Sequence, residues 1–372
     1  MKITSVKPIL VGRSLLVRVY TDEGIVGTGE AGLWAYHRWV YEALRDLGDY
    51  YVGKDPTRME HHFQVLSRET HFMGAVLSAA LSAMDIAMWD ILARSVNKPV
   101  HALLGGKVRD KVKVFANVVG ATVEERAESA RRQVERGFLS LRTTPMLPDF
   151  ETQTPTKVIK DAVAIVRAIR EAVGDEIDLG LEIHRNLAPD QAILLAHELA
   201  PFRILYYEDP LAPESIAALE YVARHVNLPI ATGERFYNLQ QFKELIDSKT
   251  VAMVRPDLSM AGGFTQVRKI AAVAEASFVS VFPHLMGSPV NIAAYVQFAA
   301  ATPNYVLMES FDVDTHPLNA IVDPPLTLED GYILVPDRPG IGLDLLEEEV
   351  GRFPFQDRTI TGWFAADGSV AH

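Results

Sequence analysis

The spacing of apolar residues predicts a mixed α+β unit at the start of the chain. Residues 15–20 (LLVRVY) form a β-branched run, residues 21–24 (TDEG) predict a turn, and residues 25–30 (IVGTGE) predict the returning strand of a hairpin. Helices are predicted over 39–51 and 75–94. In the second of these, apolar residues recur at steps of three and four, which is typical of an amphipathic or buried helix.

A different rhythm begins near residue 112, where short apolar runs alternate with helical patterns. Eight runs predict strands, at 112–117, 139–142, 178–183, 204–208, 229–233, 252–256, 279–283 and 306–310. Helical patterns lie between them, for example over 156–173, 189–200 and 262–276. Eight strand–helix units in series favour a closed (β/α)8 barrel over an open sheet.

The alternation stops after residue 310. Prolines at 324 and 325 interrupt the chain, residues 331–335 predict one more strand, and residues 336–340 (PDRPG) predict a turn. A tail of this length cannot bury a core of its own. We therefore expect it to pack against the N-terminal region.

Composition narrows the class of protein. Of 372 residues, 48% are hydrophobic and 23% are charged, which excludes a mostly disordered chain. The net charge is −12 and there is no basic run, so we expect no nucleic-acid partner. The absence of cysteine excludes disulfides, iron–sulfur clusters and thiolate zinc sites. The chain has no apolar leader and no uncharged apolar stretch of 18 residues, so we expect a cytoplasmic protein outside the membrane.

Carboxylates stand at the ends of three consecutive predicted strands. Glu182, Glu208 and Glu234 are separated by 26 residues each, so in a barrel they converge at one side of the mouth. Clustered carboxylates repel one another unless a cation joins them, and hard oxygen ligands favour Mg²⁺, with Mn²⁺ as the alternative. A purely structural explanation remains open, in which each glutamate pairs with an arginine such as Arg185 or Arg235.

Two histidines also lie at the ends of predicted strands. His184 follows Glu182 by two residues, which on a strand puts both side chains on one face and directs His184 into the mouth. Asp257 and His284 stand at the ends of the sixth and seventh predicted strands, which are adjacent. An aspartate that holds one ring nitrogen leaves the other free to act as a base.

Several motifs together resemble the enolase superfamily, and within it the mandelate racemase subgroup. They are SAMDIAMWDI at 82–91, KPV at 98–100, LLGG at 103–106, EDP at 208–210, GER at 233–235 and PDLSMAGG at 256–263. The resemblance spans nearly the whole chain. It implies an α/β fold in which a modified TIM barrel, (β/α)7β, over 112–322 is covered by an α+β capping domain. That domain combines residues 1–111 with a C-terminal segment over 323–372.

The resemblance also implies a reaction. A substrate carboxylate binds Mg²⁺, and a base removes the α-proton to give an enediolate. Many relatives carry Lys-x-Lys at the end of the second strand, but this chain has Arg142 followed by two threonines, and an arginine is a poor base.

The remaining histidines resemble those of the acid-sugar dehydratases, especially galactonate dehydratase. In such an enzyme His284, assisted by Asp257, takes the C2 proton of a D-galactonate or D-gluconate type acid. His184 protonates the departing 3-hydroxyl, and the product is a 2-keto-3-deoxy acid. Glu309, at the end of the eighth strand, hydrogen-bonds the substrate carboxylate or the enediolate.

Substrate selection is implied in loops of the capping domain. The candidates are loops 29–38 and 70–74, and in the first of them Trp34, Tyr36 and His37 would form a lid over a polyol chain. Arg142 and Arg235 are further candidates for binding the acid, and His316 follows the eighth strand. Ordinary surface packing explains the loop residues equally well, and a solvated loop position explains His316. Relatives are commonly homo-oligomers, and we expect the same of this chain.

Two departures and two alternative functions stay open. The first predicted ligand is Glu182, where many relatives have Asp, and residues 185–186 are Arg-Asn where galactonate dehydratases have Gly-Arg. Two facing histidines also suit a racemase or epimerase of a 2-hydroxy acid. A non-catalytic binding protein for acid sugars could keep the same fold.

Overall fold

The barrel predicted from the alternating pattern is present in the structure, a computed structural model that describes residues 1–69, 71–309, 313–359 and 362–370. Its strands are β4 (Lys111–Asn117), β5 (Ser140–Thr143), β6 (Asp178–Glu182), β7 (Tyr206–Glu208), β8 (Ile230–Thr232), β9 (Met253–Val254), β10 (Ser280–Val281) and β11 (Met308–Glu309). All eight predicted strands are confirmed, although the later ones are short. Ser310, the predicted end of the eighth, and Thr70, in the predicted loop 70–74, lie outside the described residues.

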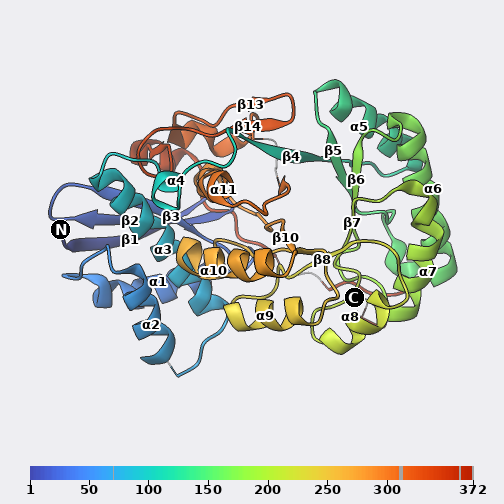
Figure 1. Ribbon diagram of the computed structural model, residues 1–372, viewed down its shortest axis with the longest axis horizontal. Helices are drawn as coiled ribbons and strands as arrows, with labels where there is room; N and C mark the ends of the chain where they lie inside the picture. The colour runs from blue at the N-terminus through green and yellow to red at the C-terminus, as the bar shows by residue number, and fades with distance from the viewer. Residues whose placement is uncertain (70, 310–312, 360–361, 371–372) are drawn as a thin grey trace.

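The strands close into a ring. Parallel pairing runs without a break from β4 to β10, Val281 bridges to Tyr305, and β11 returns to pair with β4. The helices between the strands are α5 (Val123–Glu135), α6 (Pro155–Val173), α7 (Pro189–Leu199), α8 (Ile216–Ala223), α9 (Leu239–Asp247), α10 (Gly263–Ala276) and α11 (Pro289–Ala301), with short turns η1 (Phe150–Thr152) and η2 (Ala200–Phe202). Because seven α-helices connect eight strands in the described residues, the barrel is (β/α)7β, as the resemblance implied (Figure 1).

The N-terminal region forms a separate antiparallel sheet in the order β1–β2–β3. It contains β1 (Ile3–Val11), β2 (Ser14–Thr21) and β3 (Val26–Ala31), together with α1 (His37–Tyr51), α2 (Met59–Glu69), α3 (Ala75–Ser95) and α4 (Val100–Leu103). The predicted hairpin is confirmed as β2 and β3. The sequence pattern did not predict β1, because Pro8 interrupts its apolar run. The structure puts β1 at the edge of the sheet, where a proline is tolerated.

Helix α3 is the centre of the N-terminal region. It is the one described helix long and apolar enough to cross a membrane, but 78% of its most apolar window is buried inside the protein. It packs on β3, α1 and the barrel helix α10. The length and composition of α3 are therefore those of a core helix that joins the N-terminal sheet to the barrel (Figure 1).

The C-terminal tail contacts both parts of the molecule. It contains η3 (Pro317–Ile321), β12 (Val322–Asp323), β13 (Leu328–Glu329), β14 (Tyr332–Leu334), β15 (Asp344–Leu345) and η4 (Glu347–Arg352). The strand predicted at 331–335 is β14, but it pairs with barrel strand β4 and not with the N-terminal sheet. The tail also reaches that sheet, where Glu347 accepts hydrogen bonds from Arg18 and Tyr20 of β2. The exact domain boundaries stay a prediction.

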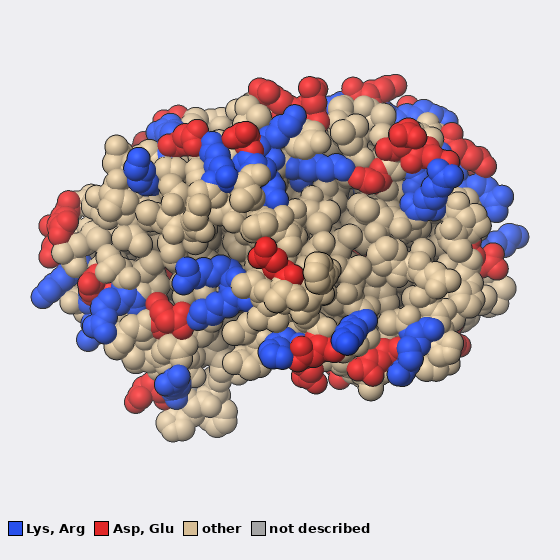
Figure 2. Space-filling view, viewed as in Figure 1, with Lys and Arg blue, Asp and Glu red and all other residues tan. Residues whose placement is uncertain are grey.

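Charged side chains of both signs lie mostly around the edge of the face shown in Figure 2, and much of its middle is uncharged. Neither a broad basic patch nor a broad acidic patch covers this face. The net charge therefore does not gather into a single patch on this face.

Candidate active site

The three predicted glutamates meet at the mouth of the barrel. Glu182 and Glu208 are the last residues of β6 and β7, and Glu234 follows β8 by two residues. Each offers a carboxylate oxygen, and these three oxygens lie within 4.8 Å of one another. Burial raises the pKa of Glu182 to about 7 and also raises the pKa of Glu208. The fold therefore holds these carboxylates closer together than their charges favour.

Two arginines lie between this cluster and the aromatic interior of the barrel. Nε of the fully buried Arg255 is 2.7 Å from Oε1 of Glu208, and its guanidinium stacks 4.2 Å from the ring centre of Phe282. The guanidinium of Arg142 stacks in the same way over Phe115, at 4.6 Å. The aromatic faces stabilise the two cations at a depth where water does not.

Glu309 joins the same two arginines. Its Oε1 is 2.8 Å from Arg142 and its Oε2 is 2.7 Å from Arg255, and Oε2 also accepts a hydrogen bond from the backbone of Leu285. Although burial opposes ionisation, these two cations lower the pKa of Glu309. It is therefore an anionic acceptor that orients the arginines, and a direct hydrogen bond from Glu309 to a substrate carboxylate stays a prediction.

A third arginine pairs with two carboxylates at the mouth. Arg185 lies 2.5 Å from both Glu234 and Asp209. Although burial favours the neutral form, His284, Arg185 and Arg255 lower the pKa of Glu234 to about 2. The structural explanation is thus realised in part, because Arg185 pairs with Glu234, Arg255 pairs with Glu208, and Arg142 lies 3.7 Å from Glu182.

The residues present fit a divalent cation. Both carboxylate oxygens of Glu208 are buried and have no hydrogen-bond partner within the described part of the chain. Around them the five carboxylates of Glu182, Glu208, Asp209, Glu234 and Glu309 face the three guanidinium groups of Arg142, Arg185 and Arg255. A divalent cation would balance the difference of two charges, and an all-oxygen ligand set suits Mg²⁺ or Mn²⁺.

The predicted dyad is formed. Nδ1 of His284 lies 2.8 Å from Oδ2 of Asp257, and Nε2 is 3.8 Å from Oε2 of Glu234. Burial disfavours the charged ring, but Glu234 and the hydrogen bond to Asp257 raise the pKa of His284 to about 9. Nε2, the ring nitrogen that Asp257 does not hold, therefore faces the glutamate cluster.

His184 reaches the same region by a route that the strand pattern did not predict. Strand β6 ends at Glu182, and His184 and Arg185 both have left-handed φ angles, of 58° and 66°. The two-residue strand period therefore does not apply to His184. The prediction that Glu182 and His184 lie on one face of a strand was wrong. His184 is exposed, and it still interacts electrostatically with Glu234 and His284. Such unusual backbone angles are typical of active-site turns.

The structure separates the two predicted substrate-binding arginines. The side chain of Arg142 is 11% exposed and lies among the carboxylates, 2.8 Å from Glu309. That of Arg235 is 51% exposed and pairs with Glu214 on the surface. Only Arg142 lies at the mouth, so the structure does not bring Arg235 into the site.

Three of the remaining candidates share one cavity. Trp34, His37 and His316 line a cavity of about 950 Å³, together with Met286 and Gly287 of the loop that follows His284 and residues 352–359 of the tail. Tyr36 is not part of its lining and stacks on Trp39, with ring centres 4.6 Å apart. The lid residues are thus near the dyad loop, whereas contact with substrate stays a prediction.

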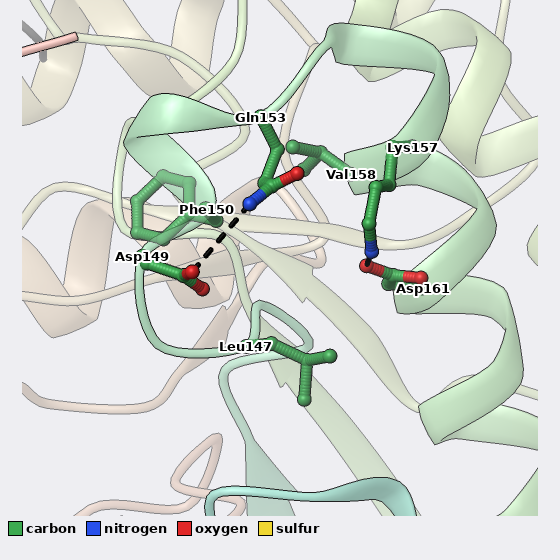
Figure 3. Close-up of a pocket in the computed structure, with 7 residues that line it drawn as sticks. All are labelled: Leu147, Asp149, Phe150, Gln153, Lys157, Val158 and Asp161. Atoms are coloured by element: carbon green, nitrogen blue, oxygen red, sulfur yellow. Dashed lines mark hydrogen bonds and ion pairs between the residues drawn. The ribbon is translucent and has the colours of Figure 1, made fainter. Parts of the chain in front are cut away.

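A second, smaller hollow lies in the connection between β5 and α6. Figure 3 shows that its lining comes from residues 147–161, where Gln153 donates to Asp149 and Lys157 pairs with Asp161. Its volume is about 240 Å³. None of the predicted site residues lines it, so we assign it no part in the site.

Arg255 is the main residue of the site that the sequence did not single out. It stands two positions before Asp257, at the end of β9, and a charged residue inside a buried strand end was the signal available. Asp209, next to Glu208, was likewise seen only as part of a motif. Both contribute to the charge balance around the three glutamates.

Comparison with known proteins agrees with the geometry. A family described as the mandelate racemase/muconate lactonizing enzyme N-terminal domain matches residues 3–105, and one described as enolase C-terminal domain-like matches residues 125–350. D-galactonate dehydratase from Variovorax paradoxus is 34% identical over 382 aligned positions that cover 100% of both chains. D-galactonate dehydratase from Pectobacterium atrosepticum is 34% identical and covers 94% of each chain.

A solved structure has the same fold. It is an enolase from Agrobacterium radiobacter, named as a candidate galactarate dehydratase, with sodium and L-malate bound. It is 31% identical, covers 100% of both chains and has a TM-score of 0.93. From its matched domains and its full-length relatives, this chain belongs to the mandelate racemase/muconate lactonizing enzyme family of the enolase superfamily.

Proposed function

We propose that this chain is a Mg²⁺-dependent sugar acid dehydratase that acts on an aldonic acid of the D-galactonate or D-gluconate type. One observation carries the proposal: the Asp257–His284 pair and His184 both adjoin a cluster of three glutamates whose carboxylate oxygens lie within 4.8 Å of one another. The names of the full-length relatives support the same reaction.

Glu182, Glu208 and Glu234 would hold the ion. When bound, Mg²⁺ supplies fixed positive charge where negative charge develops on the substrate carboxylate. Arg142, whose side chain is 11% exposed at the mouth, would contact the same end of the acid.

The chain's own residues account for both proton transfers. His284, whose Nδ1 is held by Asp257, takes the C2 proton on Nε2, and the electrons of the C2–H bond form the enediolate. His184 then donates a proton to the 3-hydroxyl, so the C3–O bond breaks and water leaves. The enol that remains takes up a proton at C3 and becomes the 2-keto-3-deoxy acid. The net change is the loss of one water molecule.

The test is a panel of aldonic acids incubated with the purified protein and Mg²⁺, with the 2-keto product read as its semicarbazone. We expect one or a few positive acids. For these, His284→Asn should slow exchange of the C2 proton with D₂O by about 10²–10⁴-fold. His197→Asn is the matched control, because His197 is an exposed residue of α7 bonded to the backbone of His225.

The alternatives give different results. Exchange at C2 without a keto product would indicate a racemase or epimerase. Binding of an acid without exchange would indicate a binding protein. Full exchange in His284→Asn would make the assignment of the base wrong.

A further inference from the structure

The buried hydroxyl of Tyr295 touches the catalytic dyad from behind. Tyr295 lies in α11 and is 0% exposed. Its hydroxyl donates to Oδ1 of Asp257 at 2.7 Å and accepts from the backbone N–H of Leu258 at 2.6 Å. The hydroxyl is thus used both as donor and as acceptor, and its orientation is fixed.

The two oxygens of Asp257 are divided between different partners. Oδ1 accepts three hydrogen bonds, from the Tyr295 hydroxyl at 2.7 Å and from the Ser259 backbone N–H and Oγ at 2.8 and 2.6 Å. Oδ2 is left to Nδ1 of His284, at 2.8 Å. Three donors on one oxygen prevent the carboxylate from rotating about its Cβ–Cγ bond. They therefore hold the other oxygen toward the imidazole.

From this arrangement we infer that Tyr295 is a positioning residue for the base, acting through Asp257. The inference rests on the proposed function, because it takes His284 as the group that removes the C2 proton. Tyr295 fixes the carboxylate plane, the carboxylate fixes the orientation of the ring, and Nε2 is thereby held toward the glutamate cluster. Partners of this kind, one step behind a functional group, typically change activity by about 10–100-fold when removed.

The place of Tyr295 in the fold supports this role. Helix α11 begins at Pro289, directly after the loop that carries His284, and Tyr295 stands almost two turns into it. The same helix therefore continues the His284 loop and touches the Asp257 loop. Burial raises the pKa of Tyr295 well above its ordinary value, so the hydroxyl keeps its proton at any working pH.

The first experiment compares two tyrosine variants. Tyr295→Phe removes one hydroxyl and leaves the ring. Tyr305→Phe makes the same change at a buried tyrosine whose hydroxyl has no hydrogen-bond partner in the described residues. On an acid that the panel identifies, we expect Tyr295→Phe to lower kcat about 10-fold with KM changed less than about twofold. Tyr305→Phe should leave both unchanged. A kcat for Tyr295→Phe within twofold of the parent enzyme would overturn the inference.

A double-variant cycle separates positioning from general stability. If Tyr295 acts through Asp257, adding Tyr295→Phe to Asp257→Asn should have little further effect on the C2 exchange rate. If the tyrosine supports only the fold, the same roughly 10-fold loss should appear in both backgrounds. An equal loss in both backgrounds would contradict the proposal.

A crystal structure of Tyr295→Phe gives a readout that needs no activity. The Asp257 carboxylate should be rotated, or its Oδ2 should lie farther from His284 than the 2.8 Å seen here. An unchanged carboxylate would contradict the inference even if no acid of the panel reacts, and an inactive parent enzyme alone would count only against the proposed function. Should Tyr295→Phe fail to fold, Ser259→Ala removes another donor to Oδ1, and we expect a fall in kcat of about threefold or more with KM kept. An unchanged kcat in Ser259→Ala would then count against the inference.

Discussion

Glu182 and Glu208 are register partners in the parallel pair β6–β7. Glu234 reaches them differently, because Glu208 pairs with Ala231 and Glu234 stands three residues farther along. The turn at Gly233 carries it back, with a φ of 125° and no room for a Cβ, which would lie 2.7 Å from Phe242. The cluster thus depends on strand register and on one glycine turn.

Removal of one ligand charge should weaken metal binding. Glu182→Gln keeps the shape of the side chain but leaves a neutral amide, so we expect the affinity for Mg²⁺ to fall at least about tenfold, measured by titration calorimetry. Glu214→Gln is the matched control, because Glu214 pairs with Arg235 on the surface. Equal Mg²⁺ affinity in both variants would exclude the three-glutamate site.

The convergence of the glutamates could be predicted from the sequence for a physical reason. Parallel strands present their C-terminal ends on one side of a barrel, so polar residues that end successive apolar runs must meet. The same reasoning could not find Arg255. An arginine at a fully buried strand end contradicts ordinary burial preferences, and here it is stabilised by ion pairs with Glu208 and Glu309 and by the ring of Phe282.

The limits of the pattern are clearest at His184. Ile183 is apolar and fully buried, so the apolar pattern in the sequence continues past Glu182, where β6 ends. The backbone then turns through left-handed conformations at His184 and Arg185, which hydropathy does not encode. The sequence therefore identified His184 as a candidate site residue, but it did not predict the turn that carries it.

The two candidate arginines should differ in their effect on activity. Arg142→Lys keeps the charge but loses the planar fork that contacts Glu309, so we expect kcat/KM to fall about 10–100-fold, mainly through KM. Arg235→Lys should stay within twofold, because that side chain is half exposed and pairs only with Glu214 among the described residues. Steady-state kinetics on the acid found in the panel measures both. A larger effect at Arg235 would restore the original prediction for that residue.

Glu347 should make the attachment of the C-terminal tail sensitive to acid. Although partial burial favours the protonated form, hydrogen bonds from Tyr20, Lys7 and Arg18 lower the pKa of Glu347 to about 2. A depressed carboxyl pKa stabilises the fold above its unfolded value near 4.5, and this contribution is lost as the pH falls toward 2. We expect Glu347→Gln to cost about 1–2 kcal/mol in urea unfolding at pH 7.

The pH dependence distinguishes this ion-paired carboxylate from ordinary surface charge. The cost of Glu347→Gln should be constant from pH 8 to about 5 and should shrink below that value. Glu348→Gln, at the exposed neighbouring position, should change the free energy of unfolding little at any pH. If Glu347→Gln lowers the free energy of unfolding by the same amount at pH 3 as at pH 7, the shape of the Glu347 side chain, and not its charge, holds the tail.

Helix α3 should show the opposite dependence on pH. One face of it carries Ser82, Asp85 and Trp89, which bond to Gly262 and Thr265 at the start of α10. The carboxylate of Asp85 takes the place of a cap for α10, whose own N-cap residue, Gly262, has no side chain. The other oxygen of Asp85 is buried without a hydrogen-bond partner among the described residues. This helix therefore holds the loop that follows Asp257 through a carboxylate that is poorly solvated.

The consequence is a stability that falls as the pH rises. Burial raises the pKa of Asp85 from 3.8 to about 7, so the folded protein binds a proton between these values that the unfolded chain has already lost. The stabilisation that comes from this bound proton is fully present below pH 4, and it is lost as the pH rises through 7. Asp85→Asn keeps an acceptor for Thr265 but cannot ionise. We expect the variant to gain about 2–4 kcal/mol relative to the parent protein between pH 4 and pH 8, measured by urea unfolding. Asp46→Asn, on the exposed side of α1, should show no such gain, and a pH-independent difference for Asp85→Asn would mean that Asp85 is ionised in the fold.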